Sequence, residues 1–165
     1  MMRAIVVYES HWGNTAAIAH AIAEGIGPEA RALSTAEATF EVVPGADLIV
    51  AGAPLLGFNL PTDSMVSGLS SETAKGGPPP DLSHPTMRTW LDALPKGAAR
   101  VAAFETKISW SPGSSSKAIL GKLEEKGYRP VAKPQRFVVK DRYGPLKEGE
   151  LERAKAWGAE LARTA

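Results

Sequence analysis

Short, continuous apolar runs alternate with segments of helical periodicity along most of the chain. None of the four clearest runs alternates with polar residues, so each is predicted to be a strand buried on both faces of a sheet. The alternation itself favours an α/β fold, in which right-handed crossovers connect parallel strands. The runs are Ala4–Tyr8, Leu48–Ala51, Val101–Phe104 and Phe137–Val139, with a weaker candidate at Ala30–Leu33.

The spacing of apolar residues predicts four helices. In the first, Asn14–Ile26, isoleucines recur every fourth residue and form one apolar stripe, and Gly27 and Pro28 follow as a stop signal. The other helices are expected at Met87–Leu94, Ser115–Lys126 and Glu148–Ala162, and residues Tyr128–Ala132 are expected to lead into the last strand, with Pro134 as a break or edge feature.

One stretch, at about residues 59–85, does not fit the alternation. It is rich in Ser, Gly and Pro and includes KGGPPPDLSHP. Loops beyond about 12–15 residues are uncommon in compact domains and tend to be functional or disordered. We therefore predict a single domain over residues 1–165 with an insertion at 59–85, which is either a lid or contact surface near a ligand, or a mobile segment without a role.

Composition excludes several kinds of chemistry. The 165 residues include no cysteine, which rules out disulfides and thiolate chemistry. No run approaches the roughly 20 apolar residues of a membrane span, and the first residues lack the apolar region of a signal peptide. A soluble cytoplasmic protein is expected. His11, His20 and His84 lack metal-ligand spacing to one another or to carboxylates, so no metal site is predicted, and no residue is assigned as a catalytic acid, base or nucleophile.

The six residues SHWGNT, Ser10–Thr15, join the first strand directly to the first helix. The first turn of a helix has unpaired backbone N–H groups at the positive end of the helix dipole, which favours a bound anion. Ser10, Asn14 and Thr15 can add side-chain donors, and Gly13 permits a positive φ. The loop has no Lys or Arg, so neutral donors would hold the anion. The alternative is that Ser10 or Asn14 only caps the helix.

Two other phosphate-binding motifs do not match. The pattern GxxxxGK[ST] is absent, and GxGxxG requires three glycines where this loop has one. A response-regulator receiver has a similar order of elements but needs an acidic cluster after the first strand, and Glu9 alone does not supply it.

The segment VVYESHWGNTAAIAHAIAEGI, Val6–Ile26, resembles the flavodoxin phosphate-loop signature T/S-x-T-G-x-T. It is most similar to the flavodoxin-domain proteins of actinobacterial type, whose loop is close to YESMFGNT. DLIVAGAP, which ends at Pro54, and GPLKEGELERAKAWGAELA, Gly144–Ala162, also resemble that family. The resemblance covers nearly the whole chain except residues 59–85.

This resemblance implies a three-layer sandwich around a five-stranded parallel sheet of order 2-1-3-4-5, with FMN at the carboxyl ends of the strands. Loop Ser10–Thr15 would hold the phosphate, and loops Ala53–Phe58 and Glu105–Ser116 would flank the isoalloxazine ring. Phe58 and Trp110 are candidates for ring contact, or else buried loop anchors. The cofactor-binding residues it implies are Ser10, His11, Trp12, Gly13, Asn14, Thr15, Pro54, Leu55, Leu56, Gly57, Phe58, Thr106, Lys107, Ser109, Trp110 and Gly113.

The chain departs from the family pattern at three places. Trp12 stands where classical flavodoxins have a threonine, which removes one hydroxyl donor. Leu55 and Leu56 stand where relatives often carry Thr and His, which removes two polar groups near the ribityl chain or ring. His11 could donate to the anion or point to solvent, and solvent is the expectation favoured here.

The implied function is that of an FMN-binding, flavodoxin-like electron carrier or small FMN-dependent oxidoreductase. A redox carrier is favoured over a substrate-specific enzyme. The alternative is a flavodoxin-fold module that has lost flavin and serves in protein interaction.

Charge is unevenly distributed between the two halves of the chain. Residues 1–86 carry a net charge of −6 and residues 87–165 carry +7. We expect a redox partner with an acidic docking surface, and no membrane partner; nucleic acid is unlikely because no reading motif is present. The alternative is that the charges only solvate exposed helix faces. The basic residues expected around the fifth strand are Lys126, Arg129, Lys133, Arg136, Lys140 and Arg142.

Overall fold

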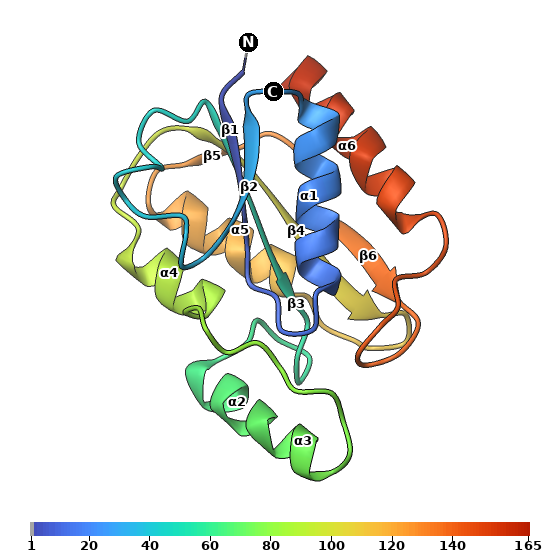
Figure 1. The fold of residues 1–165 in the computed structure, drawn as a ribbon. Coiled ribbons are helices and arrows are strands. Elements are labelled where there is room, and N and C mark those ends of the chain that lie inside the picture. Colours follow the sequence, from blue (N-terminus) through green and yellow to red (C-terminus); the bar gives the residue numbers. More distant parts are fainter. Residues whose placement is uncertain (1) are drawn as a thin grey trace.

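A parallel β-sheet runs through the centre of the protein, with helices on both faces (Figure 1). In the computed structural model, which describes residues 2–165, the first four strands are β1 (Ala4–Tyr8), β2 (Ala30–Ser34), β3 (Leu48–Pro54) and β4 (Arg100–Ile108). Their order across the sheet is β2-β1-β3-β4, and every pairing is parallel. The order reverses between β1 and β3, so the loops that follow these two strands diverge and leave room for a ligand.

The fifth position of the sheet is divided between two short strands. β5 (Arg129–Pro130) pairs with the start of β4, and β6 (Gln135–Val139) pairs with its end. Pro134 lies in the gap between them, where its lack of an N–H group breaks no hydrogen bond between strands. The predicted α/β sandwich and the order 2-1-3-4-5 are confirmed, with the last strand split where the sequence predicted a break.

Two helices cover each face of the sheet. Helices α1 (Asn14–Ile26) and α6 (Glu150–Thr164) pack on one face, and α4 (Met87–Ala93) and α5 (Ser115–Glu125) pack on the other. The alternate side chains of each central strand enter the two cores, so the predicted runs Ala4–Tyr8, Leu48–Ala51 and Val101–Phe104 are continuous in apolar residues.

Helices α1 and α6 pack backbone against backbone. A Cβ atom added to Gly158 would lie 2.2 Å from the carbonyl oxygen of Ile22, and one added to Gly25 would lie 1.9 Å from that of Lys155. Glycine is therefore required at both positions for this close approach. Within residues 2–165, no helix is long and apolar enough to cross a membrane.

The insertion at 59–85 contains short helical segments. It contains α2 (Asp63–Ser67), a single 3₁₀ turn η1 (Gly68–Ser70) and α3 (Ser71–Ala74), which lie below the carboxyl ends of the strands (Figure 1). Val66 and Leu69 are buried and anchor these helices. Helices of four or five residues cannot show an apolar stripe, so periodicity could not have predicted them.

Strand β4 continues beyond the predicted boundary. The sequence placed Glu105, Thr106 and Lys107 in a loop, but they extend the strand to Ile108 and are buried. This correction has a physical reason, because each polar side chain has a partner. Glu105 accepts the N–H of Ser116 at the start of α5 (3.0 Å). The partners of Thr106 and Lys107 belong to the candidate functional site.

Candidate functional site

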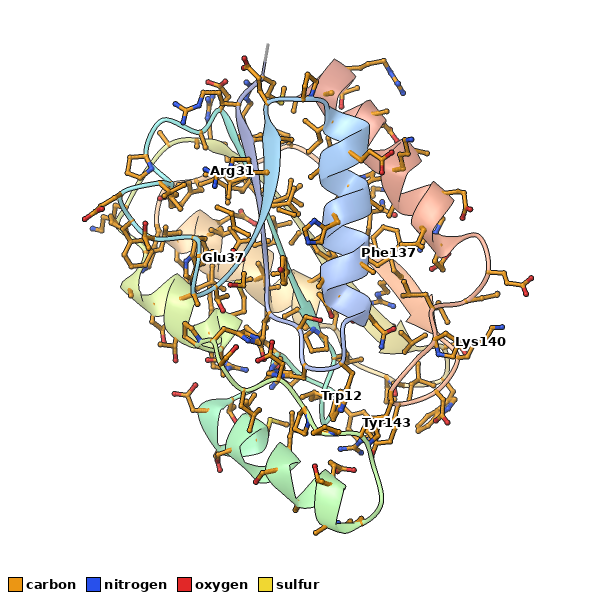
Figure 2. The ribbon with its side chains drawn as sticks, in the orientation of Figure 1. Trp12, Arg31, Glu37, Phe137, Lys140 and Tyr143 are labelled. Atoms are coloured by element: carbon orange, nitrogen blue, oxygen red, sulfur yellow. The ribbon has the colours of Figure 1, made fainter. Side chains whose placement is uncertain are left out.

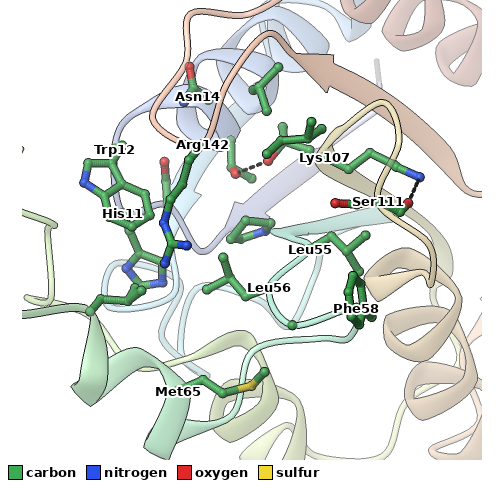
Figure 3. Close-up of a pocket in the computed structure, with 18 of the residues that line it drawn as sticks. His11, Trp12, Asn14, Leu55, Leu56, Phe58, Met65, Lys107, Ser111 and Arg142 are labelled. Atoms are coloured by element: carbon green, nitrogen blue, oxygen red, sulfur yellow. Dashed lines mark hydrogen bonds between the residues drawn. The ribbon is translucent and has the colours of Figure 1, made fainter. Parts of the chain in front are cut away.

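A cavity of about 550 Å³ opens at the carboxyl ends of the central strands (Figure 3). Its size lies within the range of small-molecule sites. The three loops expected to bind a cofactor form part of its wall, together with α2–α3 of the insertion and the loop after β6. Thirteen of the sixteen predicted residues line it: Ser10, His11, Trp12, Asn14, Thr15, Pro54, Leu55, Leu56, Gly57, Phe58, Thr106, Lys107 and Trp110.

The three remaining predicted residues lie outside this lining. Ser109 is exposed in the loop after β4. Gly113, in the loop after β4, packs closely against the loop after β3, because a Cβ atom there would lie 2.1 Å from the carbonyl oxygen of Phe58. Gly13 immediately precedes α1 with φ 91°, which confirms the expected positive φ. No heavy atom lies within 4 Å of a Cβ built there, so its backbone conformation, not crowding, calls for glycine.

The loop Ser10–Thr15, which is predicted to hold a phosphate, presents a row of free donors. Among the described residues, the backbone N–H groups of residues 11–15 find no acceptor in the protein. The Ser10 hydroxyl is buried and likewise lacks a partner within residues 2–165. A buried hydroxyl without a hydrogen bond is unfavourable by about 1–3 kcal/mol, so it indicates a place for an acceptor that is not part of the chain.

The other expected side-chain donors of this loop already have partners. Asn14 donates from Nδ2 to the carbonyl oxygen of Tyr143, 3.1 Å away. The hydroxyls of Thr15 and Thr106 lie 2.7 Å apart and both are buried. One of the two donates to the other, so one hydroxyl proton of the pair remains free to donate.

His11 does not point to solvent, which corrects the favoured expectation. Its ring is buried, with 3% of the residue exposed. Nε2 lies 2.6 Å from Oε2 of Glu9, and Nδ1 lies 2.8 Å from the carbonyl oxygen of Asp81 in the insertion. Burial lowers the pKa of His11, but the hydrogen bonds to Glu9 and to Asp81 outweigh it, so the pKa is raised above its usual value. The raised pKa favours the protonated form of this ring, a contribution to the loop that sequence reasoning did not count.

The second loop forms a tight turn at the rim of the cavity. Leu56 and Asn59 pair as an isolated antiparallel bridge, and Gly57 and Phe58 between them both have positive φ. Leu55 is fixed to the neighbouring strand, since its N–H donates to the carbonyl oxygen of Thr106 (2.9 Å). The side chains of Leu55 and Leu56 give this wall its apolar character (Figure 3).

The two aromatic candidates are exposed at the cavity rim. Phe58 is 59% exposed and Trp110 is 73% exposed. Neither is a buried loop anchor, so that interpretation is wrong, and contact with a ligand ring stays a prediction. Lys107 does not offer its ammonium group to the cavity, because Nζ donates to the carbonyl oxygen of Ser111 (2.5 Å) and thereby shapes the third loop (Figure 3).

Sequence reasoning missed the side of the cavity opposite the loops. Arg142, from the loop after β6, projects into the cavity, where it pairs with Glu72 of α3 at 2.8 Å (Figure 3). The hydroxyl of Tyr143 also donates to Glu72, and the Tyr143 ring lies edge-on to that of Trp12, with centroids 4.9 Å apart (Figure 2). Seventy residues separate Glu72 from Arg142, and no local pattern links them. Other lining residues from the insertion are Ser64, Met65, Gly68 and Leu69.

No cluster of three metal-ligating side chains is present in the part of the chain that the structure describes. The ionisable groups of the site are the buried pair Glu9–His11, the pair Arg142–Glu72 and Lys107, and the other polar groups are hydroxyls, the Asn14 amide and backbone amides. The arrangement therefore suits the binding of an elongated ligand with an anionic end at Ser10–Thr15 and a planar, apolar part between the other two loops.

Comparison with known proteins supports the fold from an independent direction. No protein-family model and no curated protein sequence matches the chain. A flavodoxin from the domain Archaea is similar in structure, with a TM-score of 0.69 and 23% sequence identity over 98% of this chain and 97% of that one. Oxidised Flavodoxin 2 from Bacillus cereus gives 0.68 and 18%, over 99% of both chains, and Flavodoxin 1 from the same organism gives 0.67 and 19%, over 98% of both. The chain has a flavodoxin-like fold.

Proposed function

We propose that the protein binds FMN in this cavity and acts in electron transfer, as a flavodoxin-like carrier or a small FMN-dependent oxidoreductase. The observation that carries the proposal is the set of free donors at the start of α1, made up of the N–H groups of residues 11–15 and the buried Ser10 hydroxyl. These groups suit a phosphate. The adjoining apolar wall and the exposed rings of Phe58 and Trp110 suit an isoalloxazine ring.

The residues present fit each part of such a cofactor. Hydrogen bonds to a charged acceptor contribute about 1.5–3 kcal/mol each, so several neutral donors suffice for a phosphate without Lys or Arg in the loop. Arg142 adds one cation on the opposite wall. When bound, FMN supplies the redox chemistry. The chain's own residues then bind it, orient it and exclude water, and none is required as an acid, base or nucleophile.

Two further features favour redox transfer to another protein. The structures similar to this chain include the two-electron-reduced flavodoxin from Megasphaera elsdenii, a protein in a defined redox state. Within residues 2–165, none of Arg129, Lys133, Arg136 and Lys140 forms an ion pair, and all four are exposed; Lys140 projects outward just beyond β6 (Figure 2). We propose that this basic side docks a partner with an acidic surface.

A second candidate function rests on the insertion. Its residues cross the phosphate loop, and His84 accepts the N–H of Ser10 (3.2 Å), so part of the loop already binds the protein's own chain. Together with Leu55 and Leu56, this favours a module that has lost flavin and serves in protein interaction.

One experiment separates the two functions. The visible absorption spectrum of the purified protein is recorded, and FMN is then titrated into stripped protein. FMN binding with one site per chain is expected. An uncoloured protein that leaves FMN fluorescence unchanged would instead support the interaction module.

The Ser10 hydroxyl allows a sharper test of the same proposal. Ser10→Ala removes a buried group without a partner, so the stability of the stripped protein should stay equal or rise, while FMN affinity falls about ten- to a hundredfold. Ser67→Ala, an exposed serine outside the cavity lining, is the matched control and should change neither property. An unchanged FMN affinity in Ser10→Ala would remove the main support for this assignment.

A further inference from the structure

Residues 77–85, here called the strap, lie along the phosphate loop and run antiparallel to it. Nε1–H of Trp12 donates to the carbonyl oxygen of Pro78 (3.1 Å). His11 and Asp81 exchange two hydrogen bonds of 2.8 Å, one from the Asp81 N–H to the His11 carbonyl and one through Nδ1 of His11. The Ser10 N–H donates to Nε2 of His84 (3.2 Å). Three successive loop residues are therefore bound by the strap.

These contacts determine the protonation of His84. A backbone N–H can only donate, so Nε2 of His84 must present its lone pair to Ser10, and the ring is neutral with its proton on Nδ1. The side chain of His84 is 4% exposed, so water offers no substitute acceptor.

The neighbouring ring of His11 requires the opposite state. Its Nδ1 faces a carbonyl oxygen, which can only accept, so Nδ1 carries a proton. Its Nε2 faces Glu9, whose other oxygen accepts the N–H of Met87 (2.7 Å). A second proton therefore lies between Nε2 of His11 and Oε2 of Glu9, in addition to the proton on Nδ1. The rings of His11 and His84 are stacked with centroids 5.3 Å apart, so the proton that His11 shares with Glu9 lies close to His84.

Several charged groups face His84 from the elements packed around it. Burial and the neighbouring His11 both oppose its protonation, whereas Asp81, with Oδ1 3.8 Å from Nδ1, and Glu9 favour it. Glu37 and Tyr8 line the same outer groove. The balance lowers the pKa of His84 below its usual value, with burial as the main cause.

We propose that protonation of His84 releases the strap from the phosphate loop, so that acid opens the anion site to solvent and exchange of its ligand. The inference rests on the proposed function only in naming that ligand as the FMN phosphate. A protonated His84 has no lone pair for the Ser10 N–H, and its charge would lie against the stacked ring of His11, which shares a proton with Glu9.

The direction of the pH dependence follows from linkage. When docking lowers the pKa of a base, the base stabilises the docked state fully only at a pH above its pKa in the undocked state, which is about 6.5 for histidine. Docking weakens as the pH falls below that value, by at most about tenfold per unit, until the docked pKa is reached. His11 acts oppositely, because loss of the proton held with Glu9 at high pH leaves a lone pair facing a carboxylate. Docking is therefore strongest near neutral pH.

The test uses hydrogen exchange of residues 77–85, followed by mass spectrometry from pH 7.5 to pH 5 and corrected for intrinsic rates, on the protein without added FMN. His84→Gln keeps an acceptor for the Ser10 N–H but cannot titrate. His20→Gln removes an exposed histidine outside the cluster and is the matched control. We expect strap exchange to rise up to about tenfold per pH unit in wild type and His20→Gln, and to stay flat in His84→Gln.

Two further measurements cover the case in which His84→Gln does not fold. In wild-type protein, the Ser10 amide signal should titrate with the His84 ring signals in NMR spectra. Asp81→Asn, which keeps the oxygen that Ser83 contacts, removes a charge that favours protonation of the docked His84, so the acid-induced rise in exchange should begin at the same pH but continue to lower pH than in wild type. Flat exchange in wild type, or equal pH dependence in His84→Gln, would overturn the proposal.

A second arm measures FMN dissociation over the same pH range. Faster dissociation in acid, absent in His84→Gln, is the expected result. If FMN does not bind at all while strap exchange follows His84, the proposed function fails and the strap mechanism stands. If FMN binds but neither exchange nor dissociation follows His84, the strap mechanism fails and the proposed function stands.

Discussion

The hydroxyl groups of Thr15 and Thr106 lie 2.7 Å apart and join the first turn of α1 to the end of β4. Thr106→Val leaves the buried Thr15 hydroxyl without this partner, so the free energy of unfolding should fall by about 1–3 kcal/mol. The double variant Thr15→Val/Thr106→Val should lose less than the sum of the single losses, because neither side then keeps an orphaned group. Urea unfolding of the four proteins checks this, and strict additivity would contradict a direct hydroxyl pair.

Gly13→Val tests the phosphate loop through its backbone. A β-branched residue is strongly disfavoured at φ 91°, so the loop should distort, and FMN affinity should fall at least about tenfold. Gly13→Asn is the matched control, because asparagine tolerates the left-handed region and open space surrounds the Cβ position. Titration of FMN into both stripped variants measures the effect. Full FMN affinity in the valine variant would remove the loop from the site.

Trp110→Ala and Phe58→Ala test the ring-binding rim. Both side chains are largely exposed, so their loss should change stability by no more than about 0.5 kcal/mol. Loss of an aromatic contact with the ligand ring should weaken FMN binding by about 0.5–1.5 kcal/mol per residue. Leu151→Ala, an exposed apolar residue on α6, provides the comparison. If the aromatic variants bind FMN as Leu151→Ala does, the rings have another role.

Acid stability should depend on Glu150. Its carboxylate pairs with Arg153 (2.9 Å) and accepts the N–H of Val138 (2.7 Å), and these contacts, led by the hydrogen bond to Arg153, lower its pKa. Its contribution is therefore complete above the unfolded pKa of about 4.3 and is lost as the pH falls through the folded value. In urea unfolding from pH 6 to pH 3, Glu150→Gln should show a shallower fall in stability than wild type, whereas the exposed Glu152→Gln should follow wild type. Equal slopes in all three proteins would deny Glu150 this role.

The basic side of the protein should govern its choice of redox partner. Reduction of bound FMN by acidic and basic reductases is compared over a salt series. Acidic reductases should react faster at low salt and lose this advantage as the Debye length falls from about 10 Å at 0.1 M to about 3 Å at 1 M. Reversal of Lys133 and Lys140 to glutamate should remove the preference. Faster transfer from basic reductases at low salt would refute the docking prediction.

The sheet could be predicted because its strands are buried on both faces and therefore appear as continuous apolar runs. The end of β4 could not, since Glu105, Thr106 and Lys107 resemble a loop until their partners are known. The phosphate loop was recognisable because its residues are contiguous. The strap and the Arg142–Glu72 pair were not, because each contact joins residues some 70 positions apart.

The backbone packing at Gly25 and Gly158 has a consequence for the order in which the molecule is made. Helix α1 carries the phosphate loop at its start, yet its apolar stripe is covered by α6, which is synthesised far later. A nascent chain that has not yet released α6 from the ribosome leaves α1 partly uncovered, and contacts so distant in sequence form slowly. We therefore expect FMN binding to begin only after α6 has left the ribosome.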